Sequence, residues 1–175
     1  MKKTAKITLC AMMAALSAVV MLVSYFPYLT YAIPAFAGLF VMVVVIEINR
    51  KWAVLTYIAS AIIVFLLAET ESKLMYIMFL GYYPILKSAL EVMHKPVFEW
   101  IIKIIVFNAA VVAVYVVFSQ MFGITLDDID ILGRYGAVIL LAVGNAVFVV
   151  YDIAVSRMAM VYMYVLHPKI KKLLL

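Results

Sequence analysis

The chain has 175 residues, of which 70% are hydrophobic and 13% are charged, and its mean hydropathy is +1.21. Soluble domains are roughly 45–50% apolar and about a quarter charged, and a soluble globule of this size leaves much of its surface in water. The composition therefore predicts an integral membrane protein and excludes a soluble enzyme, a nucleic-acid-binding domain and a disordered chain. The net charge of +5 does not indicate nucleic acid, because basic residues in membrane proteins act first as topology signals. The single cysteine, Cys10, excludes a disulfide framework and a thiolate metal cluster.

Six apolar segments of the chain predict membrane spans, each of which needs about 20 residues. In chain order they cover residues 5–26, 34–48, 52–68, 74–92, 97–119 and 135–164. The second is short, and the sixth is long enough to tilt or to leave the membrane before Tyr164. Gly81 and Pro84 predict a kink or close packing in the fourth. The sequence thus predicts one all-α domain of six transmembrane helices.

The basic residues between these spans predict the orientation of the chain. Nine of them fall on one side: Lys2, Lys3, Lys6, Arg50, Lys51, Lys95, Lys169, Lys171 and Lys172. Only Lys73 and Arg134 fall on the other side, together with the acidic residues Glu69, Glu71, Asp127, Asp128 and Asp130. Since short cytoplasmic loops are enriched in Lys and Arg, both termini are expected in the cytoplasm.

The N-terminal Met-Lys-Lys followed by an apolar run is also typical of a secretory signal peptide. The apolar core of a signal peptide is about 7–15 residues long, whereas this run continues to Phe26. Cys10 follows Leu9 rather than a small residue, which does not fit a lipoprotein site. We therefore expect the segment to be retained as a transmembrane helix.

The first span carries a stripe of small residues. Ala11, Ala14, Ala15 and Ala18 recur at helical spacing, and Thr8 continues the stripe one turn earlier. Small residues allow two membrane helices to approach closely, because lipid supplies no hydrophobic drive for their association. The stripe predicts either packing within the chain or docking of another membrane protein.

Charged residues occur inside the predicted spans, where each costs about 2.5–3.5 kcal/mol at a helix centre. Lys87 and Glu91 are four residues apart in the fourth span, and Glu99 and Lys103 repeat that spacing in the fifth. We expect these four residues to form a polar cluster between the two helices. Asp152 lies deeper, and we expect it to pair with a basic residue, for which Lys103, Lys87 and Arg157 are the candidates. The cluster is interpreted as structural pairing, with a proton or ion relay as the alternative.

A small molecule that arrives from outside would meet the outer loops and the outer halves of the helices. Membrane ligand sites combine aromatic walls with a few polar groups. The candidate substrate-binding residues are Tyr28, Tyr31, Tyr76, Asn108, Arg134 and Asn145. Asn108 and Asn145 are the strongest of these candidates, because an amide deep in a span needs a partner, which could equally be a neighbouring helix.

Motifs for catalysis are missing from the sequence. His94 and His167 have no metal-ligand spacing, and the chain contains neither an HExxH motif nor a phosphate-binding Walker loop. We therefore expect no enzyme activity, no metal site and no cofactor bound by this chain. Because the chain has no ATP site, it would depend on a partner for uptake driven by ATP hydrolysis.

The size, the six predicted spans, the short basic N-terminus and the stretch "KITLCAMMAALSAVV" resemble the S components of energy-coupling factor (ECF) vitamin transporters of prokaryotes. In that family an alanine-xxx-alanine pattern on the first helix docks on the transmembrane coupling subunit. Ala11 and Ala15 match this pattern, and Ala14 and Ala18 form an overlapping copy. The resemblance covers the whole chain in architecture and this stretch alone as a motif.

The resemblance implies a multi-pass protein of the prokaryotic plasma membrane that captures a vitamin or a cofactor precursor from outside. Its partners would be the coupling subunit and two ATPase subunits, which would use the ATP. The outer loops would cover the ligand, and the S component would topple within the bilayer during transport. The sequence carries no signature that identifies the ligand.

Two other interpretations stay open. The chain could be a membrane scaffold similar to the small rod-shape proteins that organise wall synthesis, in which case it would use the alanine stripe and the polar cluster for partner contacts. It could also be a stand-alone ion-coupled carrier. Such a carrier would need a protonatable group along its path, and Asp152 is the residue that qualifies.

Overall fold

The computed structural model describes residues 2–26, 28–93, 95–122 and 136–169, and within these ranges it contains helices and no strand. Four of the helices are long and apolar enough to cross a membrane: Lys3–Tyr25, Arg50–Leu67, Pro96–Val117 and Val138–Lys169. The prediction of an all-α chain is confirmed for the described residues. The lengths and apolar composition of these helices are compatible with a multi-pass membrane protein.

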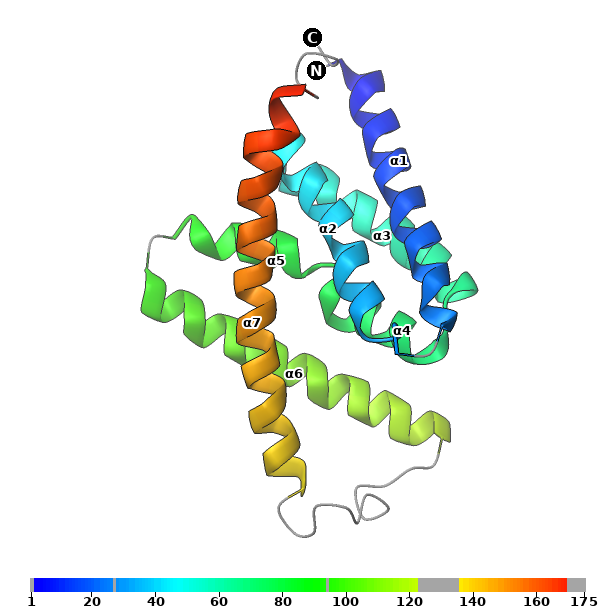
Figure 1. Ribbon diagram of the computed structural model, residues 1–175, viewed down its shortest axis with the longest axis vertical. Helices are drawn as coiled ribbons and strands as arrows, with labels where there is room; N and C mark the ends of the chain where they lie inside the picture. The colour runs from blue at the N-terminus through cyan, green and yellow to red at the C-terminus, as the bar shows by residue number, and fades with distance from the viewer. Residues whose placement is uncertain (1, 27, 94, 123–135, 170–175) are drawn as a thin grey trace. The chain divides into compact units, whose positions relative to one another are not determined.

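In the described part of the chain, nine helical elements follow one another (Figure 1). They are α1 (Lys3–Met21), the 3₁₀ turn η1 (Leu22–Tyr25), α2 (Ala32–Glu47), α3 (Arg50–Leu67), α4 (Thr70–Met75), the π-helix η2 (Tyr76–Leu80), α5 (Tyr83–Glu91), α6 (Pro96–Phe122) and α7 (Gly136–Val165). They divide into two compact units. Unit 1 is Met1–His94 with Val155–Leu175, and unit 2 is Lys95–Ala154. The first part of α7 therefore belongs to unit 2 and its last part to unit 1.

Two of the six predicted spans differ from the others in the structure. The second corresponds to α2, an apolar helix of 16 residues that is shorter than a usual span. The fourth is not one helix, because α4, η2 and α5 replace it in sequence and a turn separates η2 from α5. The interruption lies at Gly81 and just before Pro84, which occupies the first turn of α5. The predicted kink is therefore confirmed.

Side chains before α3 and α4 help to define where these helices begin. The amide oxygen of Asn49 accepts a hydrogen bond from the backbone N–H of Trp52 at 3.1 Å. The carboxylate of Glu69 accepts hydrogen bonds from the N–H groups of Glu71 and Ser72, at 3.2 and 3.0 Å. Such caps satisfy backbone donors that have no partner within the helix.

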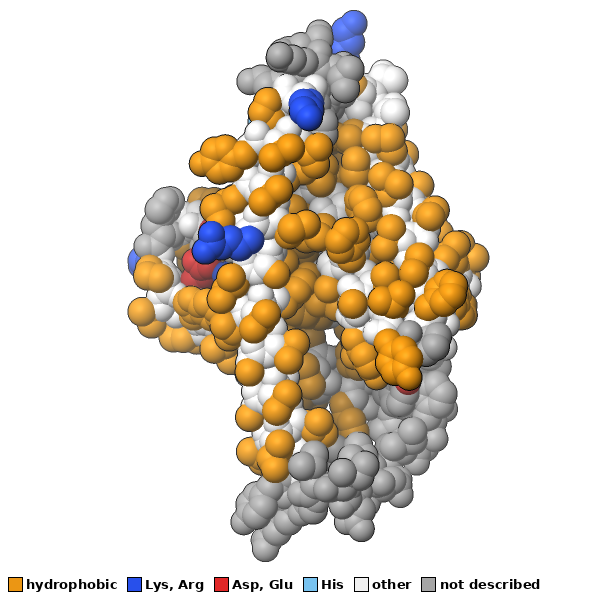
Figure 2. Space-filling model, in the orientation of Figure 1, with side chains coloured by type: hydrophobic (Ala, Val, Ile, Leu, Met, Phe, Trp, Pro, Cys, Tyr) orange, Lys and Arg blue, Asp and Glu red, His pale blue; other side chains and the backbone are white. Residues whose placement is uncertain are grey.

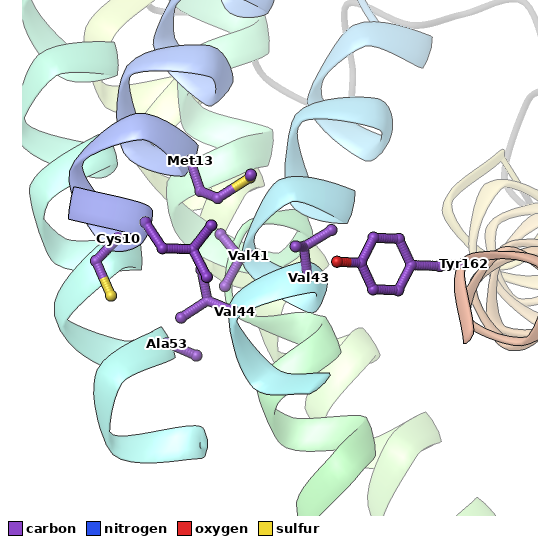
Figure 3. Close-up of a cluster of buried hydrophobic side chains, with 8 residues drawn as sticks. Cys10, Met13, Val41, Val43, Val44, Ala53 and Tyr162 are labelled. Carbon is purple, nitrogen blue, oxygen red and sulfur yellow. The ribbon is translucent and has the colours of Figure 1, made fainter. Parts of the chain in front are cut away.

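A core of apolar side chains holds four helix ends of unit 1 together (Figure 3). Leu9, Cys10 and Met13 come from α1, and Val41, Val43 and Val44 come from α2. Ala53 of α3 and Tyr162 of α7 complete the cluster. The beginnings of α1 and α3 and the ends of α2 and α7 therefore lie at one end of this unit, as the ribbon also shows for α1 and α7 (Figure 1).

Apolar side chains also cover much of the visible surface (Figure 2). Leu66 on α3 is 74% exposed, and Val147 on α7 is 63% exposed. Contiguous exposed apolar surface on this scale marks contact with a membrane or a partner. Together with the helix lengths, it fits faces that contact lipid.

The π-helix η2 packs against α3 at very close range. The N–H of Gly81 donates to the carbonyl of Tyr76 at 2.8 Å, which is the i to i+5 bond of a π-turn. The hydroxyl of Tyr57 donates to the carbonyl of Ile77 at 2.6 Å. A methyl group at Gly81 would lie 2.8 Å from the Tyr76 carbonyl oxygen and 2.9 Å from the ring of Tyr57. The break in the helix thus depends on the missing side chain at Gly81.

We expect Gly81→Ala to lower the free energy of unfolding by about 1–3 kcal/mol, because the added methyl group must displace the backbone or a packed ring. Unfolding of the purified protein in detergent, followed by circular dichroism, measures the change. Gly144→Ala is the matched control, since its methyl group would lie 3.6 Å from the ring of Phe107, an ordinary contact. A Gly81→Ala protein as stable as Gly144→Ala would contradict the packing argument.

Candidate functional site

The alanine stripe of α1 divides into two faces in the structure. Ala14 and Ala18 are buried, with exposed fractions of 4% and 6%. Ala11 and Ala15 are exposed. The two overlapping alanine pairs therefore have different surroundings, which their spacing in the sequence did not distinguish.

The buried pair lies on the face of α1 that packs within unit 1. Ala18 belongs to a cluster that includes Ala37 of α2 and Val64 of α3. One position before Ala18, the buried hydroxyl of Ser17 donates to the backbone carbonyl of Ala37 at 3.1 Å. A side-chain hydroxyl reaches another helix's backbone only when the two helices are close, and small residues permit that approach. This pair therefore has a structural role.

The exposed pair forms a smooth strip on the surface of α1. Thr8 is also exposed, and its hydroxyl donates to the carbonyl of Thr4 on the same helix at 3.1 Å, so it is satisfied within α1. Larger apolar side chains flank the strip, including Met12 at 50% and Val19 at 59% exposure. A strip of small residues between larger apolar ones can receive a ridge of side chains from another membrane helix. It is the candidate docking face of this protein.

Hydrogen bonds connect the loop before α2 with the region around α4. The hydroxyl of Tyr31 donates to the Glu71 carboxylate at 3.1 Å, and the hydroxyl of Ser72 donates to the Thr30 carbonyl at 2.7 Å. Partial burial and the hydrogen bond to Glu71 raise the pKa of the Tyr31 hydroxyl above its usual value of 10.0. Tyr28 is 97% exposed and has a positive φ of 73°. The loop before α2 is thus linked to α4, and Tyr28 projects from that loop.

Tyr76, another predicted ligand contact, is fully buried at the start of η2. Its hydroxyl is 2.7 Å from the hydroxyl of Ser60 on α3, which donates in turn to the carbonyl of Tyr57 at 2.9 Å. The three predicted tyrosines therefore differ in their contacts: Tyr28 is exposed, Tyr31 bonds to Glu71, and Tyr76 is buried beside Ser60. Arg134 lies outside the described residues, and the role of the tyrosines as ligand contacts stays a prediction.

Asn108 and Asn145 pair with each other in unit 2. Each side-chain NH₂ group donates to the amide oxygen of the other residue at 3.1 Å. Each also donates to the carbonyl four residues earlier on its own helix, Ile104 or Leu141, at 2.8 Å. Both hydrogens of each amide are used in this arrangement, which connects α6 to α7. The structure thus shows the neighbouring-helix partner, and a ligand contact by either amide stays a prediction.

Lys103 forms the centre of a second polar connection between α6 and α7. Its ammonium nitrogen lies 2.6 Å from Oε1 of Glu99 and 3.0 Å from Oδ1 of Asp152. Lys103 is 1% exposed and Asp152 is 4% exposed. The ring of Trp100 also faces this ammonium, with its centroid 5.3 Å away. The expected pairing of Asp152 with a basic residue is confirmed for Lys103.

The other half of the predicted polar cluster is an ion pair within α5. Nζ of Lys87 lies 3.4 Å from Oε1 of Glu91, and the Lys87 side chain is buried whereas that of Glu91 is half exposed. The two predicted i, i+4 pairs are both present. They belong to different units, so the prediction that all four residues form one cluster stays a prediction.

Sequence analysis missed a polar group at the end of α2. The Glu47 carboxylate, 4% exposed in its side chain, accepts a hydrogen bond from the Tyr162 hydroxyl at 2.7 Å. Nδ1 of His167 lies 2.9 Å from the same oxygen. Glu47 falls at the end of the predicted second span, and its place in the sequence did not indicate these partners. The described residues include no cluster of three or more His, Cys, Asp or Glu side chains that could hold a metal ion.

Comparison of the chain with protein-family models, with curated proteins and with solved structures found no match.

We expect the amide pair to give a measurable coupling energy in a double-mutant cycle of Asn108→Ala and Asn145→Ala. Polar pairs between membrane helices average about 0.6 kcal/mol and reach about 1.7 kcal/mol. The free energy of unfolding in detergent of the wild type, the two single variants and the double variant gives the coupling. A cycle of Asn108→Ala with Ser60→Ala is the control, because Ser60 bonds to Tyr57 and Tyr76 instead. Equal coupling in the two cycles would contradict the pairing.

Removal of the central ammonium should destabilise unit 2 strongly. We expect Lys103→Met to cost roughly 3–5 kcal/mol, because removal of one partner from a buried ion pair is strongly destabilising. Lys95→Met serves as control, since Lys95 is exposed just before the same helix. If the two variants unfolded at the same denaturant concentration, the contacts of Lys103 with Glu99 and Asp152 would have no stabilising role.

Proposed function

We propose that this protein is the S component of an ECF-type importer, which captures a vitamin or cofactor precursor and docks through α1 on a coupling subunit. In this proposal the chain crosses the plasma membrane of a prokaryotic cell six times, with both termini in the cytoplasm. Two ATPase subunits bound to the coupling subunit supply the energy. The protein itself binds no cofactor and catalyses no reaction.

The exposure of Ala11 and Ala15 is the observation that supports this proposal most. These two residues match the family's docking pattern, and they lie on the free face of α1, whereas Ala14 and Ala18 face the interior of unit 1. A docking motif must be accessible to its partner. Of the two alanine pairs that match the pattern, the exposed one is thus the pair that we propose for docking.

Six spans follow if α2 and the interrupted α4–η2–α5 segment also cross the bilayer. A short helix can be accommodated by local thinning of the membrane. An interrupted helix is tolerated inside a membrane protein where other groups satisfy the backbone. The hydrogen bond from Tyr57 to the Ile77 carbonyl in η2 has this effect.

The ligand in this proposal is a small molecule that enters from the side of the Tyr31–Glu71 and Ser72–Thr30 contacts. These contacts connect the loop before α2 with α4, and in this proposal the two segments cover the ligand. Tyr28, with its exposed ring, is suited to contact a ligand through stacking.

A pull-down of the tagged protein from its native membrane tests the proposal. We expect the wild type to retain ATPase and coupling subunits, identified by mass spectrometry, and Ala11→Trp/Ala15→Trp to lose them by at least tenfold. Two indole rings on the smooth strip would prevent close approach of another helix. Both proteins should show the same helical circular dichroism, because neither position is buried.

Ala142→Trp/Ala146→Trp on α7 is the matched control, because it has the same residue type and spacing and both positions are exposed. It should retain the partners of the wild type. Wall-synthesis proteins in place of an ATPase would contradict the transport function and favour the scaffold. Retention of the ATPase by the α1 variant would contradict docking through this strip.

A further inference from the structure

Basic side chains gather at the end of unit 1 where α1 and α3 begin and α7 ends. We call this group the basic rim; its members are Lys2, Lys3, Lys6, Arg50, Lys51 and Lys169. We propose that the basic rim binds the headgroups of anionic phospholipids and so selects these lipids from the surrounding bilayer. The proposal requires that the chain spans a membrane, and it does not depend on the transport function.

The packing of the helices brings these six residues to one end. Leu9, one turn after Lys6, lies in the same apolar cluster as Ala53, which follows Lys51 by two residues. Tyr162 of α7 belongs to that cluster too, and α7 continues from it towards Lys169. Figure 2 shows Lys and Arg side chains at the end where, in the same orientation in Figure 1, α1 begins and α7 ends.

The charge of the rim is not neutralised within the described part of unit 1. Glu69 and Glu71 lie near the opposite end of α3, and Glu91 is paired with Lys87. Glu47 is the acidic residue at the rim's own end, but its carboxylate is buried and already bonded to Tyr162 and His167. Among the described residues, the six basic side chains form no ion pair. The described part of unit 1 thus leaves the charge of the rim available to an anionic partner.

The rim also lies against the dipoles of two helices. Lys3 begins α1, Arg50 begins α3, and neither helix has an acidic residue in its first turn. The N-terminus of a helix carries partial positive charge, which favours anions and disfavours cations. Basic side chains at two such ends add to the positive potential and make an anionic partner more favourable.

A lipid fits this surface better than a soluble anion or an acidic protein, because the rim adjoins exposed apolar side chains. Ile7 is 50% exposed next to Lys6, and Leu55 is 57% exposed one turn after Lys51. One phospholipid molecule carries both an anionic phosphate and apolar chains. It can therefore contact the basic side chains of the rim and the apolar side chains next to them. Lys and Arg near a membrane surface each favour anionic lipid, and the attraction is screened by salt.

Trp52, the residue after Lys51, provides a probe at the rim itself. The other tryptophan, Trp100, is replaced by Phe, which keeps an aromatic ring beside Lys103. The full chain is reconstituted in two kinds of phosphatidylcholine bilayer. One contains phosphatidylglycerol with brominated acyl chains, and the other contains the same mole fraction of phosphatidylcholine with brominated acyl chains. Bromine quenches a tryptophan at short range, so the quenching of Trp52 by the two lipids gives their relative association with the rim.

We expect brominated phosphatidylglycerol to associate severalfold more strongly than brominated phosphatidylcholine, and the preference to fall with added salt. In Lys3→Gln/Arg50→Gln/Lys51→Gln the preference should disappear, while quenching by phosphatidylcholine stays unchanged and reports an intact fold. The control Lys73→Gln/Lys95→Gln/Arg157→Gln removes the same charge at other positions and should keep the preference. Free inorganic phosphate should not displace the lipid.

Three results would overturn the proposal. Equal quenching by the two lipids in the wild type would show that the rim selects no headgroup. Loss of the preference in the control variant would assign it to net charge rather than to the rim. Displacement by inorganic phosphate at millimolar concentration would identify a site for free anions. Each of these outcomes leaves the test of docking through α1 unaffected.

Discussion

Polar groups that lie among apolar helices must find their partners within the protein, and this constraint determines many of the helix contacts of this chain. An unsatisfied polar group costs several kcal/mol in hydrocarbon. Ser17 therefore reaches the backbone of α2, Lys103 reaches Asp152 across α6 and α7, and Glu47 accepts a hydrogen bond from Tyr162. Apolar packing alone would allow neighbouring helices to slide, because lipid covers their surfaces as well as protein does. The directional bonds fix the register.

The interruption between α4 and α5 follows from the same constraint. A π-turn leaves backbone groups that an α-helix would satisfy, and π-turns are frequent at functional sites. Here the Tyr57 hydroxyl satisfies the Ile77 carbonyl, and the Tyr76 hydroxyl bonds to Ser60. The same tyrosine rings pack so closely around Gly81 that a methyl group has no room. Hydroxyl groups on α3 and a missing side chain on the turn thus together stabilise an irregular helix in an apolar environment.

The sequence predicted the long helices well, because an apolar run of about 20 residues has few alternatives to a helix. It also predicted that Asp152 pairs with a basic residue, and Lys103 was one of its three candidates. It did not predict that Asn108 and Asn145 pair with each other, because that depends on the register of α6 against α7. Glu47 was missed for a related reason, as its partners lie more than 100 residues away along the chain. Composition determines which segments are helical, whereas the hydrogen-bond partners of buried polar side chains depend on how the helices pack.

Helix α1 shows how one small-residue pattern can have two roles. Positions four residues apart lie on one side of a helix, and a shift by three residues rotates the pattern by about 60° at 3.6 residues per turn. That rotation separates the Ala11 and Ala15 strip from the buried face of Ala14 and Ala18. The buried face holds α1 against α2 through Ser17 and Ala18, so the helix that presents the exposed strip is packed against the rest of unit 1. A docking surface on such a helix needs little reordering when a partner binds, because its backbone is already fixed.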